Sequence, residues 1–295
     1  MTIKQLTQIV LAIVVSLSAG IVVRENFVED TCSRDALDHV LDGGRLVLHD
    51  NCVLIVSPAV VITGNVYIEG GMLHSNGVDR VLIVEEGARL VLNDTAILSG
   101  SVEIAPAYGG AIYNAGTLLL QNTRISASSA EQGGGIYNTG SLYVRNSEIS
   151  RNRAREGGGI YNLGYLIIEN SIITENSARA DSNYGGYGAG IVNKGAAGIT
   201  SSQIINNRGN GEGIGIDTSG TLVIRDSVIM GNQCTVADCR GTGILRFEGT
   251  VDARHNYWGS SDGPGEEGSG SGDGVIGLNV ESYQPFLTET PDWWD

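Results

Sequence analysis

A unit of about two dozen residues repeats through the middle of this chain. The segment GGAIYNAGTLLLQNTRISASSA begins at Gly109, and GGGIYNTGSLYVRNSEISRNRA and GGGIYNLGYLIIENSIITENSA follow from Gly133 and Gly157. Weaker copies continue as GAGIVNKG and GIGIDTSG. A fixed period of this length is typical of stacked supersecondary units rather than one globular core.

Within each copy, apolar and polar residues alternate in short runs that Gly and Asn separate, and no run has helical spacing. This pattern predicts short strands and turns. Stacking such copies in register gives an all-β, right-handed parallel β-helix. Residues 46–258 hold roughly nine coils at this period. Only 6% of the residues are aromatic, so we expect the narrow interior to be filled by aliphatic columns, such as Leu118, Leu142, Leu166, Ala197 and Leu222, and Ile125, Ile149, Ile173, Ile204 and Ile229.

Polar residues also recur at the repeat period. The asparagine column, which we interpret as structural, consists of Asn152, Asn176, Asn207 and Asn232. Stacked asparagine side chains can bond one another and the neighbouring backbone at a buried turn. Charged residues of opposite sign lie one period apart and predict exposed ion pairs between coils, at Arg124 and Glu148, Arg145 and Glu169, and Arg151 and Glu175.

Three sequence segments resemble bacterial extracellular proteins. The GGGI and I-x-x-N motifs are similar to the GGA[ILV] and FxxN repeats of polymorphic outer-membrane proteins, with Ile in place of Phe. The segment DTCSRDALDHVLDGGRLVLHDNCVLIV looks like an N-terminal cap with a CSLREA-type motif, and NYWGSSDGPG resembles a segment at the last coil of such proteins. The resemblance implies a right-handed β-helix and export, and it is compatible with adhesins and surface proteins.

The N-terminus bears on location. Residues 1–26 contain a mostly apolar run that follows Lys4, and either a cleaved signal peptide or an uncleaved membrane anchor fits it. Both alternatives place the repeats outside the cytoplasm, secreted or anchored at the cell surface. Residues 27–45 contain SRDALDHVLDGG, whose apolar residues share one helical face, and we expect a capping helix there. Residues 259–295 are expected to form an acidic, Gly-rich loop and a C-terminal cap or tail.

Four cysteines fit an exported protein. Cys32 and Cys52 flank the expected capping helix, and we expect a disulfide that pins it over the open end of the solenoid. Cys234 and Cys239 lie five residues apart and are expected to close a small loop. Metal binding is the alternative for both pairs, but neither a histidine nor a third cysteine accompanies them.

Two features are candidates for ligand binding. Two insertions, after Asn176 and after Asn232, leave the same turn of their coils. They should therefore project on one side of the rod, two coils apart, and could form a binding surface. The alternative is that this turn only tolerates insertions. The second feature is a set of outward-facing tyrosines that could stack on sugars or a partner protein, with self-stacking as the alternative. The candidate residues are Tyr113, Tyr137, Tyr161, Tyr184 and Tyr187.

Catalytic and metal signals are weaker. Acidic residues such as Asp217, Asp226 and Glu169 are scattered among the columns, which we interpret as surface decoration rather than a clustered catalytic pair. The acidic loop offers Asp262 and Asp273 as tentative Ca²⁺ ligands, with a solvated loop as the default and no other cofactor expected. A net charge of −15 disfavours nucleic acid and anionic membrane surfaces as partners.

Three functions stay open. The first is a non-catalytic surface or structural protein that binds glycans or a cell-surface protein, as adhesins do. The second is a carbohydrate-active enzyme, a polysaccharide lyase or a glycoside hydrolase. The third is an architectural subunit of a membrane-associated assembly, held by the N-terminal helix. Carboxylates that converge within about 10 Å in a cleft would favour the second.

Overall fold

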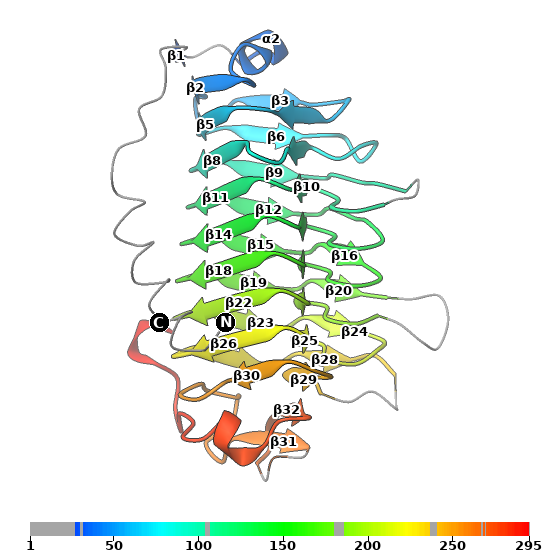
Figure 1. Cartoon of the computed structure of the whole chain (residues 1–295), viewed down its shortest axis with the longest axis vertical. Helices are drawn as coiled ribbons and strands as arrows, with labels where there is room; N and C mark the ends of the chain where they lie inside the picture. The colour runs from blue at the N-terminus through cyan, green and yellow to red at the C-terminus, as the bar shows by residue number, and fades with distance from the viewer. Residues whose placement is uncertain are drawn as a thin grey trace.

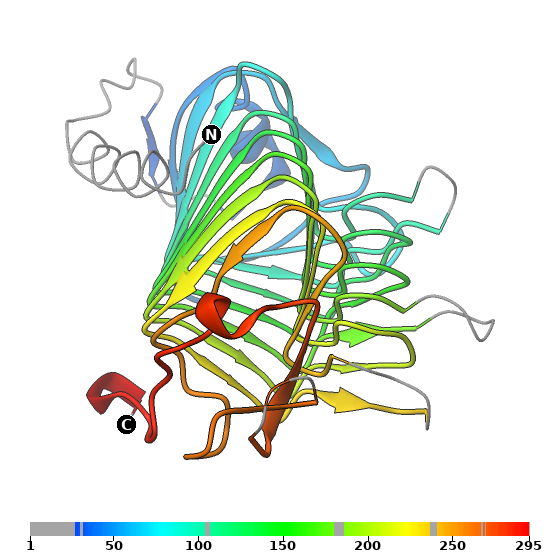
Figure 2. The same ribbon diagram turned by 60° about the horizontal axis from the view of Figure 1, so that its bottom comes forward.

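A computed structural model describes residues 27–29, 32–103, 107–179, 186–236, 241–266, 268 and 270–294. The chain winds into a rod of stacked coils, with the N-terminal coils at one end and the C-terminal strands at the other (Figure 1). In the repeats each described strand pairs in parallel with the equivalent strand of the next coil, which confirms the β-helix prediction. Figure 2 looks toward the rod's end and shows the sheets enclosing one narrow interior.

Over the described residues the strands form four sheets, named here by one member each. The β14 sheet contains β1 (Phe27–Glu29), β2 (Gly43–Val47), β5 (Asn65–Glu69), β8 (Arg89–Asn93), β11 (Thr117–Gln121), β14 (Ser141–Arg145), β18 (Tyr165–Glu169), β22 (Ala196–Thr200), β26 (Thr221–Arg225) and β30 (Thr250–Asp252). The β13 sheet contains β4 (Val60–Ile62), β7 (Leu82–Val84), β10 (Ile112–Asn114), β13 (Ile136–Asn138), β17 (Ile160–Asn162), β21 (Ile191–Asn193), β25 (Ile216–Thr218), β29 (Ile244–Arg246), β32 (Gly272–Ile276) and β31 (Pro264–Glu266).

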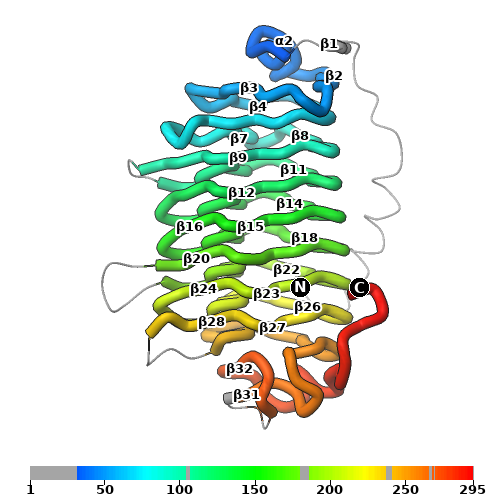
Figure 3. The backbone as a smooth tube through the Cα atoms, turned by 180° about the vertical axis from the view of Figure 1, so that it is seen from behind, coloured from blue at the N-terminus to red at the C-terminus, as the bar shows by residue number. Residues whose placement is uncertain are grey.

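The β15 sheet contains β3 (Val53–Ile55), β6 (Met72–His74), β9 (Ala96–Leu98), β12 (Arg124–Ser126), β15 (Glu148–Ser150), β19 (Ile172–Thr174), β23 (Gln203–Ile205) and β27 (Val228–Met230). The sequence predicts three strands in each repeat. Four coils add a fourth, two-residue strand, and these short strands form the β16 sheet: β16 (Arg153–Ala154), β20 (Ser177–Ala178), β24 (Arg208–Gly209) and β28 (Gln233–Cys234). Figure 3 shows them extending the coils at one edge of the rod.

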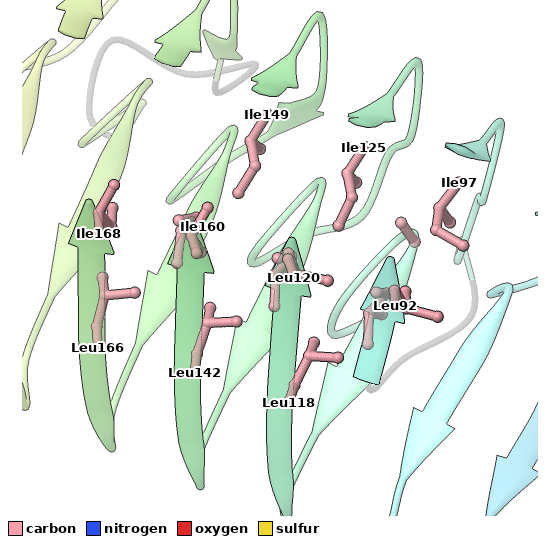
Figure 4. Packing of buried hydrophobic residues seen from close by; sticks show 14 of the residues in the cluster. Leu92, Ile97, Leu118, Leu120, Ile125, Leu142, Ile149, Ile160, Leu166 and Ile168 are labelled. Carbon is pink, nitrogen blue, oxygen red and sulfur yellow. The ribbon is translucent and has the colours of Figure 1, made fainter. Parts of the chain in front are cut away.

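The predicted aliphatic columns lie inside the rod. Leu118, Leu142 and Leu166 are in register across β11, β14 and β18, and all three are fully buried. Ile125, Ile149 and Ile173 are likewise in register across the β15 sheet and fully buried. In Figure 4 Leu118, Leu142 and Leu166 form a row on successive coils. Ile125 and Ile149 lie in a second row, and both rows belong to one continuous core. Each side chain therefore packs against its own equivalent in the next coil, which fixes the register.

The asparagine column is buried and continuous. The backbone N–H of Asn152 donates to Oδ1 of Asn176 at 3.0 Å, and the same bond joins Asn176 to Asn207 at 3.0 Å. Asn207 continues the series to Asn232 at 3.1 Å. A second ladder joins asparagines that also recur at the repeat period, and in it Nδ2 of Asn138 donates to Oδ1 of Asn162 at 2.7 Å. Both ladders satisfy polar groups that the turns would otherwise bury unpaired.

The predicted ion pairs form between neighbouring coils. Their N···O distances are 3.7 Å for Arg124 and Glu148, 2.9 Å for Arg145 and Glu169, and 2.6 Å for Arg151 and Glu175. The partly exposed pairs add little stability individually, on the order of 0–1 kcal/mol each. They confirm that positions one repeat apart are neighbours.

Both ends of the solenoid are closed. Helix α2 (Arg34–Asp38) is shorter than the predicted 27–45 segment, because a strand occupies Gly43–Val47 already. Ser33 caps α2 by accepting the N–H of Ala36, and the Cys32–Cys52 disulfide ties the start of the helix to the segment between β2 and β3. At the other end, β32 joins the β13 sheet, and the 3₁₀ helices η1 (Val280–Ser282) and η2 (Asp292–Trp294) follow.

Cys234 is also disulfide-bonded. Its predicted partner, Cys239, and the predicted N-terminal signal or anchor in residues 1–26 lie outside the described residues. Within the described part of the chain, no helix is long and apolar enough to cross a membrane.

Candidate binding cleft

A ladder of tyrosines runs along the outer face of the β13 sheet. Tyr113, Tyr137 and Tyr161 are in register on β10, β13 and β17, as alternation predicts. Their rings stack nearly parallel, with centroids 5.6 Å apart for Tyr113 and Tyr137 and 5.2 Å apart for Tyr137 and Tyr161. Only 7% of Tyr137 and 3% of Tyr161 is exposed. The rings thus turn their faces to one another, and a ligand on this ladder would meet mainly ring edges.

A cation lies at each end of the ladder. The guanidinium carbon of Arg80 lies 5.4 Å from the ring centroid of Tyr113, and Nζ of Lys194 lies 5.1 Å from that of Tyr161. Both are within the range of a cation–π interaction. Lys194 marks the coil where the tyrosine ladder stops.

The ladder stops because the next two coils carry shorter side chains in the same column. Register places Val192 beside Tyr161 and Asp217 beside Val192. This change leaves a cleft of about 200 Å³ on the outer face of the sheet. Gly213 has a φ of +60°, and a Cβ there would lie 2.9 Å from Cβ of Asp217. Glycine at this turn therefore leaves room for the carboxylate that forms the cleft floor.

The two rims come from the residues before and after the strands. Glu156 and Tyr187, paired across neighbouring coils, form one rim. The residues that directly follow β21, β25 and β29 form the other, and these are Lys194, Ser219 and Phe247. The rings of Tyr187 and Phe247 approach edge to face with centroids 6.5 Å apart. Aromatic side chains from both rims thus meet beside the polar floor.

Asp217 is the chemically unusual residue of the cleft. It is only 9% exposed, and across the described residues no hydrogen bond and no cation within 4.0 Å reaches its carboxylate. Desolvation by burial raises the pKa of Asp217 to about 7. The charge of Lys194 opposes this rise, whereas Glu156 and Glu212 add to it. The carboxyl group is therefore partly protonated near neutral pH.

The neighbouring charges are already engaged. One oxygen of Glu156 accepts from Arg155 at 3.0 Å, and the other accepts from Gln132 at 3.1 Å and lies 3.9 Å from Nζ of Lys194. Burial lowers the pKa of Lys194, but a hydrogen bond with Tyr161 and nearby negative charges outweigh it and raise the pKa. The Lys194 ammonium is therefore held charged between Glu156 and Tyr161.

The structure corrects the interpretation of Asp217 as surface decoration. It is a buried carboxylate in a cleft, near Glu156 and Lys194. The signal was in the repeats, because GIDTSG carries Asp where the earlier copies carry Tyr or Val, and Lys194 follows the first shortened position. Scattered positions in the sequence converged because they lie in adjacent columns of successive coils.

The other candidate residues are placed as follows. Tyr187 lines the cleft, and Tyr184 lies outside the described residues. The cores of the two insertions are also outside, but β20 and β28, which precede them, lie in one sheet with only β24 between them. This arrangement matches the prediction that the two insertions leave the same turn of their coils and lie two coils apart.

The two candidate Ca²⁺ ligands take part in hydrogen bonds. Oδ1 of Asp262 accepts from the N–H of Ser271 at 3.0 Å and from its hydroxyl at 2.9 Å. The carboxylate of Asp273 accepts from the N–H groups of Gly231 and Asn232, at 3.1 Å each, and so ends the asparagine column. In the described ranges no three His, Cys, Asp or Glu side chains cluster as a metal site would require. Calcium binding stays a prediction.

Comparison with known proteins agrees with the architecture. Residues 90–257 match the family described as right handed beta helix region, and this match includes the tyrosine ladder and all the residues that line the cleft. No curated protein and no solved structure matches the chain. Because the match covers more than half of the sequence, this chain belongs to the right-handed β-helix family.

Proposed function

We propose that this protein binds glycans outside the cytoplasm through the cleft around Asp217. The observation that carries the proposal is a buried carboxylate, without a bonding partner in the described structure, between two aromatic rims. Sugar-binding sites need polar groups for hydroxyls and aromatic surfaces for the apolar faces of the rings. The cleft supplies both.

The shape of the site suits a polymer. A volume of about 200 Å³ is below the roughly 300–1,000 Å³ of typical small-molecule pockets. The cleft is therefore sized for one unit of a longer ligand. The neighbouring coils present further side chains along the rod, so a chain of sugars could extend over several of them.

The free-energy cost of burying the Asp217 carboxyl group supports a functional role for this residue. A carboxyl group whose pKa is raised by burial destabilises the folded state at neutral pH. The same column holds Tyr, Val or Leu in other coils, and these residues carry no such cost. Unfavourable groups of this kind are concentrated at functional sites.

The resemblance to polymorphic outer-membrane repeats and the disulfide at Cys32 and Cys52 support an exported, adhesin-like protein. Fractionation of the native cells, with N-terminal sequencing of the mature chain, tests this part. A full-length chain recovered from the cytoplasm would contradict export.

Glycan binding is tested with a glycan array and titration of the oligosaccharides that bind. Replacing both rim rings, Tyr187→Ala with Phe247→Ala, should weaken binding at least tenfold, because the sugar loses its apolar surface. Trp293→Ala is the matched control, since Trp293 is 40% exposed and belongs to η2 at the far end of the chain. Equal binding by all three proteins would place the ligand elsewhere. Binding of no glycan would refute the proposal.

A second candidate, a carbohydrate-active enzyme, is favoured by one observation. Asp217 has a pKa of about 7, with desolvation as the main cause, so its carboxyl can donate a proton near neutral pH. Glu156 lies two coils away, which is roughly 10 Å along the rod axis at the usual strand spacing. An acid and a second carboxylate flanking a cleft are the groups that glycoside hydrolysis requires.

An assay for new reducing ends on the glycans that bind tests this alternative. Product release by the wild type that Asp217→Asn abolishes would establish catalysis. Binding without turnover would leave the protein a lectin-like binder.

A further inference from the structure

We propose that the cleft prefers amine-bearing sugars, such as hexosamine units without the N-acetyl group, over neutral and acidic sugars. This inference rests on the proposed glycan-binding function and names its ligand class. Glu156, Asp217 and Glu212 bring three carboxylates close enough to influence one another, against Lys194 within the cleft.

The charge of Glu156 is already compensated. Arg155, Gln132 and Lys194 all contact its carboxylate, at 3.0, 3.1 and 3.9 Å. The ammonium of Lys194 also lies over the ring of Tyr161. Asp217 is the carboxylate that none of the described donors or cations contacts, although it is 91% buried. A ligand ammonium at this point would supply the missing partner.

The aromatic rims act in the same direction. Phe247 is 58% exposed and Tyr187 is partly exposed, so ring surface is accessible beside Asp217. A cation near such rings gains a cation–π attraction, which strengthens as water is excluded. An anionic sugar gains neither contact. A uronate or a sulfated unit would instead face the carboxyl group of Asp217, which none of the described cations contacts, and like-charge contacts oppose binding.

Lys194 gives the inference a second, independent consequence. Its ammonium repels a ligand ammonium but does not itself reach Asp217 within 4.0 Å. Removing the charge of Lys194 should therefore tighten binding of an amine-bearing sugar. A loss of folding could not produce this gain, so the variant keeps the test interpretable.

The experiment titrates the whole protein with three oligosaccharides of equal length, built from glucosamine, N-acetylglucosamine and galacturonate, at pH 6.5 and physiological salt. We expect glucosamine oligomers to bind at least tenfold more tightly than the other two. Asp217→Asn should remove this preference, whereas Lys194→Gln should increase affinity for glucosamine oligomers several-fold.

Asp226→Asn is the matched control. Asp226 is exposed and lies on the same coil as Asp217, and its substitution removes one formal negative charge, whereas Asp217 is partly protonated near neutral pH. Nonspecific attraction of a polycation to this acidic protein would therefore fall at least as much in the control as in Asp217→Asn. A preference that survives Asp217→Asn, or one that Asp226→Asn removes equally, would overturn the inference.

The outcomes also separate the two proposals. N-acetylglucosamine or galacturonate oligomers could bind at least as tightly as glucosamine oligomers, and the Tyr187→Ala and Phe247→Ala double variant could still lose that binding. This result would refute amine selectivity and leave the glycan-binding proposal intact. Binding of none of the three, together with a blank glycan array, would refute both.

Discussion

The buried asparagine column makes the sharpest stability prediction, at Asn176. Its Oδ1 accepts the backbone N–H of Asn152 at 3.0 Å, and its Nδ2 donates to the carbonyl oxygen of Ile149 at 2.9 Å. The same side chain also accepts from Nδ2 of Asn152 and donates to Oδ1 of Asn207, at 3.1 Å each. Asn176→Ala removes all four bonds and leaves the Asn152 N–H buried without an acceptor. An unsatisfied buried donor costs about 1–3 kcal/mol, and each further lost bond about 1 kcal/mol. We therefore expect a loss of at least about 3 kcal/mol.

A loss of this size is a large share of the 5–15 kcal/mol that stabilises a typical protein. Urea unfolding followed by far-UV circular dichroism measures it, and native-state exchange of the Asn152 amide shows whether the damage is local. The matched control is Asn65→Ala, because Asn65 is exposed on β5. If Asn176→Ala lost no more than the control, within about 0.5 kcal/mol, the column would not stabilise the stack.

Two further predictions concern the ends of the rod. The Cys32–Cys52 disulfide links residues 20 positions apart in the sequence. Removing it with Cys32→Ser and Cys52→Ser should lower the free energy of unfolding in urea by about 3 kcal/mol. An unchanged urea midpoint would show that α2 needs no covalent tether. Desolvation of Asp252 acts to raise its pKa, but hydrogen bonds from Arg254 and Arg225 outweigh it and lower the pKa to about 2. The depressed pKa stabilises the fold above pH 4, and this contribution disappears as the pH falls towards 2. The free energy of unfolding of the wild type should therefore exceed that of Asp252→Asn by on the order of 2 kcal/mol at pH 6, and the two values should converge near pH 2. A difference independent of pH would contradict this.

The repeats made the architecture predictable. Equivalent positions one period apart, such as Leu142 and Leu166, could be assigned to one column before any contact was known. The cleft was not predictable in the same way, because it arises where the repeat is broken. Asp217 and Lys194 belong to different columns and different coils, and only the lateral spacing of the columns brings them together. The fourth strand, which four of the coils carry, was missed because two residues are too few to show alternation.

The most direct test of the cleft is the titration of Asp217 itself, followed by the ¹³C chemical shift of its carboxyl group. The structure predicts a pKa of about 7, caused first by burial and increased by Glu156 and Glu212 against the opposing charge of Lys194. Saturation with glucosamine oligomers should lower that pKa, because an ammonium partner favours the charged form. A pKa near the ordinary value of about 4, unchanged by the ligand, would show that Asp217 is neither desolvated nor part of a binding site.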